Sequence, residues 1–232
     1  MEGNLKPPAT VLNKLFAEQG KAQSRPWGRE EFPAIANWLD SNEEPLKLVI
    51  EGSQRPRYFS PIVVQKKGGQ TQGLVSVLLP AVQRSRCFAR ALTARAMRKL
   101  KEGKPQQAWE DLLACHRLAR LVGQGPTLVE GLVGIAIEGM AIQVELKLIG
   151  HTSPDAATAR AYLKDLESLP PASNMADRLN LAERMMFLDA TLMLAGGQRK
   201  FMGGFSLPKQ FFAWSADWDI VLQMGNEWYD EF

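Results

Sequence analysis

The sequence predicts an all-α protein made of stacked antiparallel helices, in an arrangement like that of tetratricopeptide and other helical repeats. Two observations lead to this prediction. Residues 77–150 contain three consecutive helical segments: one basic and amphipathic, one amphipathic, and one almost entirely apolar. Segments on both sides of this region also carry apolar residues at helical spacing. An irregular N-terminal part and a Gly- and Phe-rich loop near the C-terminus complete the prediction.

Length and composition are those of an ordinary globular protein. The chain has 232 residues, of which 45% are hydrophobic and 23% charged, which is enough for one large helical domain. We expect an N-terminal helix and linker over residues 1–28 and a single helical domain over 29–232, either complete or truncated at its C-terminus. The net charge of +3 is too small to indicate nucleic-acid binding by itself.

The cysteines and the most apolar stretch indicate neither a disulfide-rich scaffold nor a membrane span. Cys87 and Cys115 lack the spacing of a zinc site and are too few for a disulfide-dense scaffold. A single Cys87–Cys115 bridge stays open as an alternative to two free thiols if the protein is exported. Residues 1–20 do not resemble a secretory signal. We expect a soluble chain, because the apolar residues 128–149 include four charged residues and are therefore not typical of a membrane span.

The N-terminal third is predicted to contain three short helices. The first covers residues 7–18, with a polar linker over 21–28. Helices over 30–39 and 43–52 each have a proline in the first turn, where a missing backbone donor costs little. Residues 58–64 are expected to form a short strand or an extended segment, and residues 65–73 a loop. The apolar side of the first helix consists of Val11, Leu12, Leu15 and Phe16.

The next two segments are predicted to form a helical hairpin. A helix over 74–101 must accommodate Pro80, which either kinks it or lies in its first turn. A helix over 105–122 returns, and the pair resembles one tetratricopeptide unit. The matching positions are Leu92, Ala96, Gly103, Ala108, Leu112 and Cys115. Lys99 stands where that repeat has tyrosine and no second unit follows, so a generic helical hairpin is an equal alternative.

Residues 128–149 are predicted to form the central, buried helix, because they are apolar almost all round. Further helices are expected over 153–169, 174–195 and 215–229. Residues 196–214, which are rich in glycine and phenylalanine, show no clear period and are predicted to be a loop.

Glu138 and Glu145 are the main candidate binding residues, because they lie seven residues apart on one side of the apolar helix. Two carboxylates lining a pocket would have raised pKa values and acid–base potential. The commoner arrangement is an ion pair, here with Arg95 or Arg117 on neighbouring helices, since a buried charge without a partner is costly. His116 is a further candidate, and we expect it to be a partly buried helix histidine.

No catalytic residue, metal site or cofactor is predicted. A dimetal site needs Glu-x-x-His motifs on paired helices, and neither His116 nor His151 belongs to such a motif. The basic helix over 84–101 has the charge to contact phosphates, anionic lipid or an acidic partner. Ion pairs with Glu110 and Asp111 are the simpler explanation, because no aromatic platform or nucleic-acid motif accompanies the basic residues.

Several short segments also suggest a family. Residues 108–120 and 124–130, together with 38–39, 42–46, 55–58, 217–218 and 228–230, resemble a broad group of uncharacterised helical proteins common in planctomycete-type bacteria. The resemblance covers most of residues 27–232 and implies architecture rather than mechanism, since the family has no established activity. Its longer members often begin with a membrane anchor or export signal, which implies that membrane association would depend on a longer form.

We therefore expect a non-catalytic helical interaction or scaffold domain with a protein partner. One alternative is an enzyme or small-ligand-binding protein that uses a Glu- and Arg-lined pocket in the helical core. Another is an adaptor for anionic membrane surfaces that uses the basic helix over 84–101.

Overall fold

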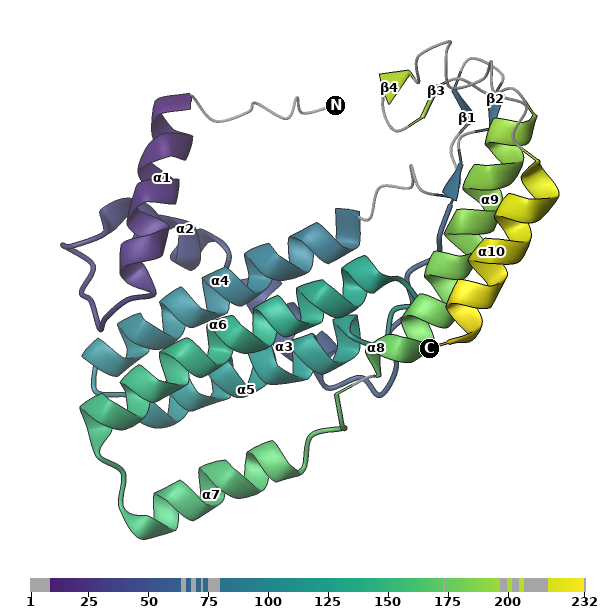
Figure 1. Cartoon of the computed structure of the whole chain (residues 1–232). Coiled ribbons are helices and arrows are strands. Elements are labelled where there is room, and N and C mark those ends of the chain that lie inside the picture. Colours follow the sequence, from purple (N-terminus) through teal and green to yellow (C-terminus); the bar gives the residue numbers. More distant parts are fainter. Residues whose placement is uncertain are drawn as a thin grey trace.

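The computed structural model describes residues 9–63, 66–67, 70–71, 73–74, 80–172, 174–196, 200–201, 205–206 and 217–231. The predicted all-α fold class is confirmed (Figure 1). Two hairpins of two-residue strands lie in segments predicted to be loops. One pairs β1 (Lys66–Lys67) with β2 (Gln70–Thr71), and the other pairs β3 (Lys200–Phe201) with β4 (Phe205–Ser206). Within the described ranges, no helix is long and apolar enough to cross a membrane.

Three helices form the centre of the fold: α4 (Pro80–Lys101), α5 (Pro105–Val122) and α6 (Leu128–Thr152) (Figure 1). Pro80 begins α4, so the proline lies in the first turn and does not kink the helix. Gly103 makes the tight turn to α5 with a φ of 73°, a left-handed conformation that glycine adopts without strain. The predicted hairpin is therefore present, while its relation to tetratricopeptide repeats stays a prediction.

Close packing of α5 against α6 depends on a glycine and on a well-capped helix start. A methyl group at Gly134 would lie 2.9 Å from the carbonyl oxygen of Ala119, so only glycine allows this approach. At the start of α6, the Thr127 hydroxyl accepts from the Glu130 N–H at 3.2 Å. The Glu130 carboxylate in turn accepts from the Thr127 N–H at 3.0 Å. This capping box explains why the fully buried Glu130 is present in an apolar helix.

The N-terminal helices α1 (Ala9–Ala22), α2 (Pro33–Ser41) and α3 (Glu43–Ser53) lie beside α4 and α5. Because α1 continues to Ala22, the predicted linker is shorter than residues 21–28. The side chains predicted to form its apolar side, those of Val11, Leu12, Leu15 and Phe16, lie outside the described residues. Trp27 is fully buried, and its indole N–H donates to the Ala94 carbonyl of α4 at 3.0 Å. This bond fastens the N-terminal segment to the central helices.

Helix α7 (Ala156–Glu167) follows α6 and is attached to α5 through one tryptophan. The indole ring of Trp109 stacks on Tyr162, with ring centroids 4.0 Å apart. The indole N–H of Trp109 also donates to the Asp165 carboxylate at 2.8 Å. Trp109 therefore provides both the apolar and the polar contact between α5 and α7.

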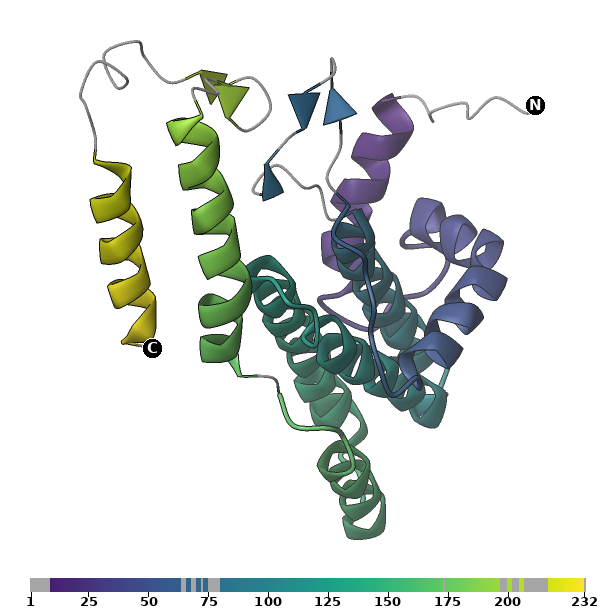
Figure 2. The ribbon, with the colours of Figure 1, turned by 90° about the vertical axis from the view of Figure 1, so that its right-hand side faces the viewer.

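The C-terminal part forms a helical arm beside the central helices (Figure 2). Helix α8 (Met175–Arg178), the π-helical turn η2 (Leu179–Glu183) and α9 (Arg184–Ala195) are continuous, and α10 (Trp218–Asp230) packs against α9. Arg184 of α9 joins this helix to α10, because its guanidinium donates to Asn226 at 2.6 Å and pairs with Asp230 at 2.8 Å. Near the start of α6, Arg178 donates to the Gly125 carbonyl at 2.9 Å and so anchors the arm.

Candidate functional site

The two candidate carboxylates of α6 face α5, and His116 lies between them. The imidazole Nδ1 is 3.1 Å from Oε1 of Glu138, and Nε2 is 3.3 Å from Oε2 of Glu145. Arg120, one turn further along α5, lies 3.2 Å from the same oxygen of Glu138. The His116 side chain is 2% exposed, and those of Glu138 and Glu145 are 20% and 15% exposed. Three residues selected from the sequence thus meet in one charged cluster.

The charges of this cluster stabilise one another. Burial alone would lower the pKa of His116, but Glu138 and Glu145 outweigh burial and raise it to about 9. Burial alone would raise the pKa of Glu138, but His116 and Arg120 lower it below its usual value. At neutral pH the cluster therefore places two carboxylates against two cations and is balanced in charge.

The prediction that Arg95 or Arg117 forms ion pairs with Glu138 and Glu145 was wrong. Arg95 pairs with Asp111 instead, at 2.7 Å. Arg117 forms no ion pair with any residue in the described part of the chain. The reason lies in the helical geometry of α5, where His116 and Arg120 are one turn apart on the side toward α6, whereas Arg117 is rotated from His116 by about 100°.

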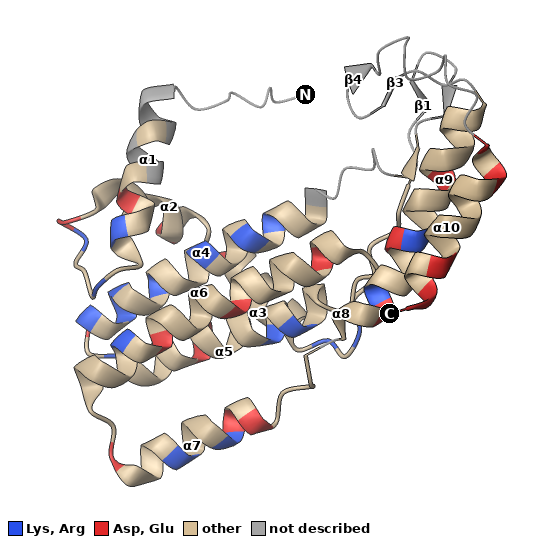
Figure 3. Cartoon of the chain, in the orientation of Figure 1, with Lys and Arg blue, Asp and Glu red and all other residues tan. Residues whose placement is uncertain are grey.

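The basic surface of α4 (Figure 3) is partly neutralised by acidic residues. The buried carboxylate of Asp111 lies 2.7 Å from the Arg95 guanidinium and 3.0 Å from Lys99 Nζ. Arg98 also has acidic partners on α2 and at the end of α4. Asp111 was predicted as a partner of this surface, whereas Glu110, also predicted, is exposed. Arg25, and to a smaller extent Lys101, lowers the pKa of the Glu31 carboxyl, so Lys101 also lies near an acidic residue. Three further basic residues form no ion pair with an acidic residue in the described part of the chain: Arg84, Arg86 and Arg90.

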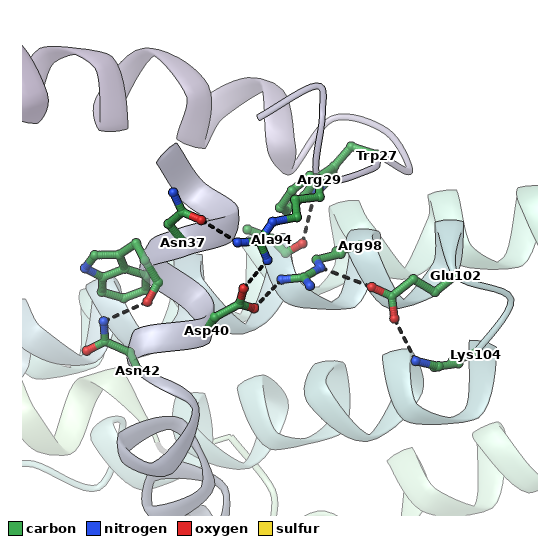
Figure 4. A network of polar contacts seen from close by, with 10 residues as sticks. Trp27, Arg29, Asn37, Asp40, Asn42, Ala94, Arg98, Glu102 and Lys104 are labelled. Carbon is green, nitrogen blue, oxygen red and sulfur yellow. Dashed lines mark hydrogen bonds and ion pairs between the residues drawn. The ribbon is translucent and has the colours of Figure 1, made fainter. Parts of the chain in front are cut away.

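A cavity of about 360 Å³ opens between the N-terminal helices and the α4–α5 turn. Figure 4 shows Arg98 between the carboxylates of Asp40 and Glu102, at 2.6 and 3.1 Å. Lys104 lies 2.8 Å from the other oxygen of Glu102. The cavity wall thus contains Arg and Glu, but its charged groups satisfy one another, which leaves little electrostatic attraction for a ligand.

The described residues do not supply a metal site or an activated thiol. No group of three or more His, Cys, Asp or Glu side chains in the described ranges can hold a metal ion. Both cysteines are free thiols, Cys87 exposed and Cys115 buried, so the alternative bridge is not formed. Burial raises the pKa of the Cys115 thiol, which makes it a poor nucleophile.

The most extensive apolar surface of the central helices lies on α6. The predicted central helix is buried only in part: α4 and α5 cover one side of it, and α8 and η2 lie against its start. On the opposite side, Leu132, Ile135 and Leu146 are 53%, 59% and 61% exposed, and Ile142 and Ile149 are 41% and 38% exposed. We call this side the outward face, which consists of Leu132, Ile135, Gly139, Ile142, Leu146 and Ile149.

The residues of the outward face are spaced alternately by three and four, so they form one line along the helix. Glu138 and Glu145 lie on one edge of this line and turn toward α5. Lys147 is turned toward the end of α1, where it donates to the Gln23 carbonyl at 3.1 Å. Helix α6 is thus apolar on two sides, since Val133, Ile137 and Leu148 are buried in the core while the Leu and Ile side chains of the outward face are exposed. The spacing of Leu and Ile was visible in the sequence, but the direction of the core was not.

Gly139 lies in the middle of the outward face. A methyl group at this position would meet nothing within 4 Å, unlike one at Gly134. Glycine in an exposed helix interior destabilises the helix by roughly 1 kcal/mol relative to alanine. No close packing within the described part of the chain requires this glycine. A second cavity, of about 430 Å³, lies beside it between the end of α1 and α6.

Comparisons with protein-family models, with curated proteins and with solved structures gave no match to this chain.

Proposed function

We propose that this protein is a helical interaction domain that binds a protein partner through the outward face of α6. The observation that carries the proposal is the exposure of five Leu and Ile side chains in one line, with no charged residue between them. Exposed apolar surface that is contiguous, and not scattered, is typical of a protein-binding site.

The energetics of the outward face support this function. Burying a Leu or Ile side chain completely contributes about 1.5–3 kcal/mol, so a half-exposed one can still contribute roughly 1 kcal/mol when a partner covers it. Five such side chains offer on the order of 5 kcal/mol from one copy of the protein. This gain about offsets the lower estimates of the free-energy cost of association, and the apolar surface that the partner buries in return supplies the net binding energy.

The catalytic alternative has less support. A general acid or base must reach a substrate proton, and a carboxylate pair has that potential when it lines an open pocket. Glu138 and Glu145 are instead held by His116 and Arg120. The described cavities are lined by other residues. Ion pairing of these carboxylates is therefore better explained by the packing of α5 against α6.

The membrane-adaptor alternative also has less support. Arg95, Arg98 and Lys99 of the basic helix are engaged by acidic side chains, so fewer charges remain for anionic lipid. The apolar outward face is not flanked by the row of Lys and Arg that membrane-surface helices carry.

Site-specific photo-cross-linking tests the proposed function. A photoreactive amino acid replaces Ile135 on the outward face or, as a control, Leu48 on α3, which is similarly exposed at 66% against 59%. We expect illumination of cells that produce the protein to give a discrete cross-linked species from position 135 only. Equal labelling from both positions, or no cross-link from position 135, would contradict the proposal.

A further inference from the structure

We infer that the cavity between the N-terminal helices and the α4–α5 turn binds a small molecule that carries a phosphate group. Its volume of about 360 Å³ lies at the lower end of the range of small-molecule sites. The residues that line it come from α2, α3 and the α4–α5 hairpin, so the site is separate from the outward face of α6.

The side chains around this cavity carry one more positive than negative charge. Five lining residues are basic: Lys47, Arg95, Arg98, Lys99 and Lys104. Four acidic residues face them, three in the lining and one that pairs with it from below: Asp40, Glu43, Glu102 and Asp111. Arg29 and Glu44 pair with lining residues from outside, which adds one charge of each sign and leaves the excess unchanged.

The excess charge lies where Arg95 and Lys99 share one carboxylate. Arg98 on the cavity wall is balanced by two acidic side chains (Figure 4), so that wall gives a ligand little attraction. Asp111 instead lies 2.7 Å from Arg95 and 3.0 Å from Lys99, and it balances only one of their two charges. The side chains of Arg95 and Lys99 are only 12% and 20% exposed, so water screens the remaining charge poorly and an anion in the cavity is attracted to it.

Both cations keep hydrogen-bond donors for a ligand. Arg95 donates to Asp111 through Nε and Nη2, and its Nη1 has no hydrogen-bond partner among the described residues. The Lys99 ammonium has three donors, and its two contacts are with Asp111 and, at 3.4 Å, with the Gln107 carbonyl. Because Asp111 occupies the planar fork of Arg95, the remaining donors belong to separate nitrogens. This arrangement suits a tetrahedral phosphate better than a planar carboxylate, which is bound best by an intact arginine fork.

The start of α5 adds to the attraction for an anion. Lys104 and Gln107 line the cavity, and they are the N-cap and the third residue of this 18-residue helix. The first turn of α5 contains no acidic residue, and no side chain caps it. Since the start of a helix carries a partial positive charge, it attracts an anion in the same direction as the excess charge of the side chains.

Isothermal titration calorimetry of the full chain with inorganic phosphate, at constant ionic strength, tests the site. We expect saturable binding by the unaltered protein. Lys99→Met should raise the dissociation constant about tenfold or more, because it removes the excess charge and leaves Arg95 paired with Asp111. Lys101→Met is the matched control, because it makes the same change of charge on an exposed side chain that does not line the cavity. This control should bind phosphate with unchanged affinity.

Two further measurements separate the site from folding and from charge alone. Urea unfolding should show that Lys99→Met is at least as stable as the unaltered protein, since Asp111 keeps one cation as its partner. Lys104→Met, which changes a lysine that is 49% exposed at the same cavity, should also weaken phosphate binding without affecting the core. No saturable binding of phosphate, or equal affinities in Lys99→Met and Lys101→Met, would overturn the site. An affinity for acetate equal to that for phosphate would overturn the assignment to a phosphate group.

Discussion

The carboxylate of Asp111 on α5 is fully buried and accepts two hydrogen bonds from the guanidinium of Arg95 on α4, at 3.0 and 2.7 Å. Lys99, one turn along α4, lies 3.0 Å from the same carboxylate. A single carboxylate thus pairs with two cations where the helices of the hairpin cross and balances one of their two charges. The geometry is bidentate, which makes this the best-formed ion pair between the two helices.

Replacing Asp111 with Asn should destabilise the fold by about 3 kcal/mol, because it leaves Arg95 and Lys99 without a counter-charge in a mostly buried position. Urea unfolding followed by circular dichroism measures this change. The control is Asp40→Asn, which removes a carboxylate that is 43% exposed and should change the free energy of unfolding by less than about 1 kcal/mol. Similar losses in both variants would contradict the assigned role of burial.

Most helix boundaries could be predicted from the sequence, because local signals determine them. Pro80 and Pro105 each lie at the first position of a helix, and Gly103 adopts the left-handed turn between α4 and α5. The extension of α1 to Ala22 was not predicted, because the polar residues from Lys21 onward were interpreted as a linker. The hairpin pairing β1 with β2 was also missed, since two-residue strands leave no periodic signal.

The candidate site was harder to predict because its residues come from two helices. The spacing of Glu138 and Glu145 indicated a shared side of α6, but not which helix would cover it. Nothing in the sequence links His116 to α6, although in the fold it lies between both carboxylates. The outward face was missed for the same reason: an apolar helix is usually buried on all sides. Which side of α6 is covered follows from the way α5 packs against it, and the sequence does not indicate this packing.

The His116 cluster should make stability depend on pH. Because the pKa of His116 is raised in the folded state from 6.5 to about 9, its stabilising effect is complete below pH 6.5 and is lost as the pH rises to about 9. The loss is on the order of 3 kcal/mol, since each pKa unit corresponds to about 1.36 kcal/mol. Denaturant unfolding measured across this pH interval reports it.

The control for this prediction is His116→Gln, which cannot carry a positive charge. We expect the variant to be less stable than the unaltered protein at pH 6.5 and to lose little further stability as the pH rises to 9. A separate effect appears in acid, because the lowered pKa of Glu138 makes its contribution disappear as the pH falls below 4.5. An identical pH profile in variant and unaltered protein would exclude His116 as the titrating group.

Two glycines of α6 should respond oppositely to the same substitution. Gly134→Ala should destabilise the protein by about 2 kcal/mol, because the new methyl group would meet the Ala119 carbonyl at 2.9 Å and the backbone of Gly123 at 3.2 Å. Gly139→Ala should stabilise the protein by up to about 1 kcal/mol, since its methyl group enters open space in a helix. Thermal unfolding of the two variants at low protein concentration measures both effects. A loss of stability in both would contradict the described exposure of Gly139.

Tyr162→Ala should release α7 without unfolding the central helices. The substitution removes the ring that stacks on Trp109 at 4.0 Å and leaves Asp165 as the main contact of α7 with α5. Hydrogen exchange should then become faster across Ala156–Glu167, while α4, α5 and α6 keep their protection, because local opening needs only the loss of local contacts. Leu163→Ala is the matched control, because Leu163 is 54% exposed on the same helix and contributes little burial. Faster exchange throughout α5 in the Tyr162 variant would show instead that Trp109 and Tyr162 stabilise the whole core and not only the attachment of α7.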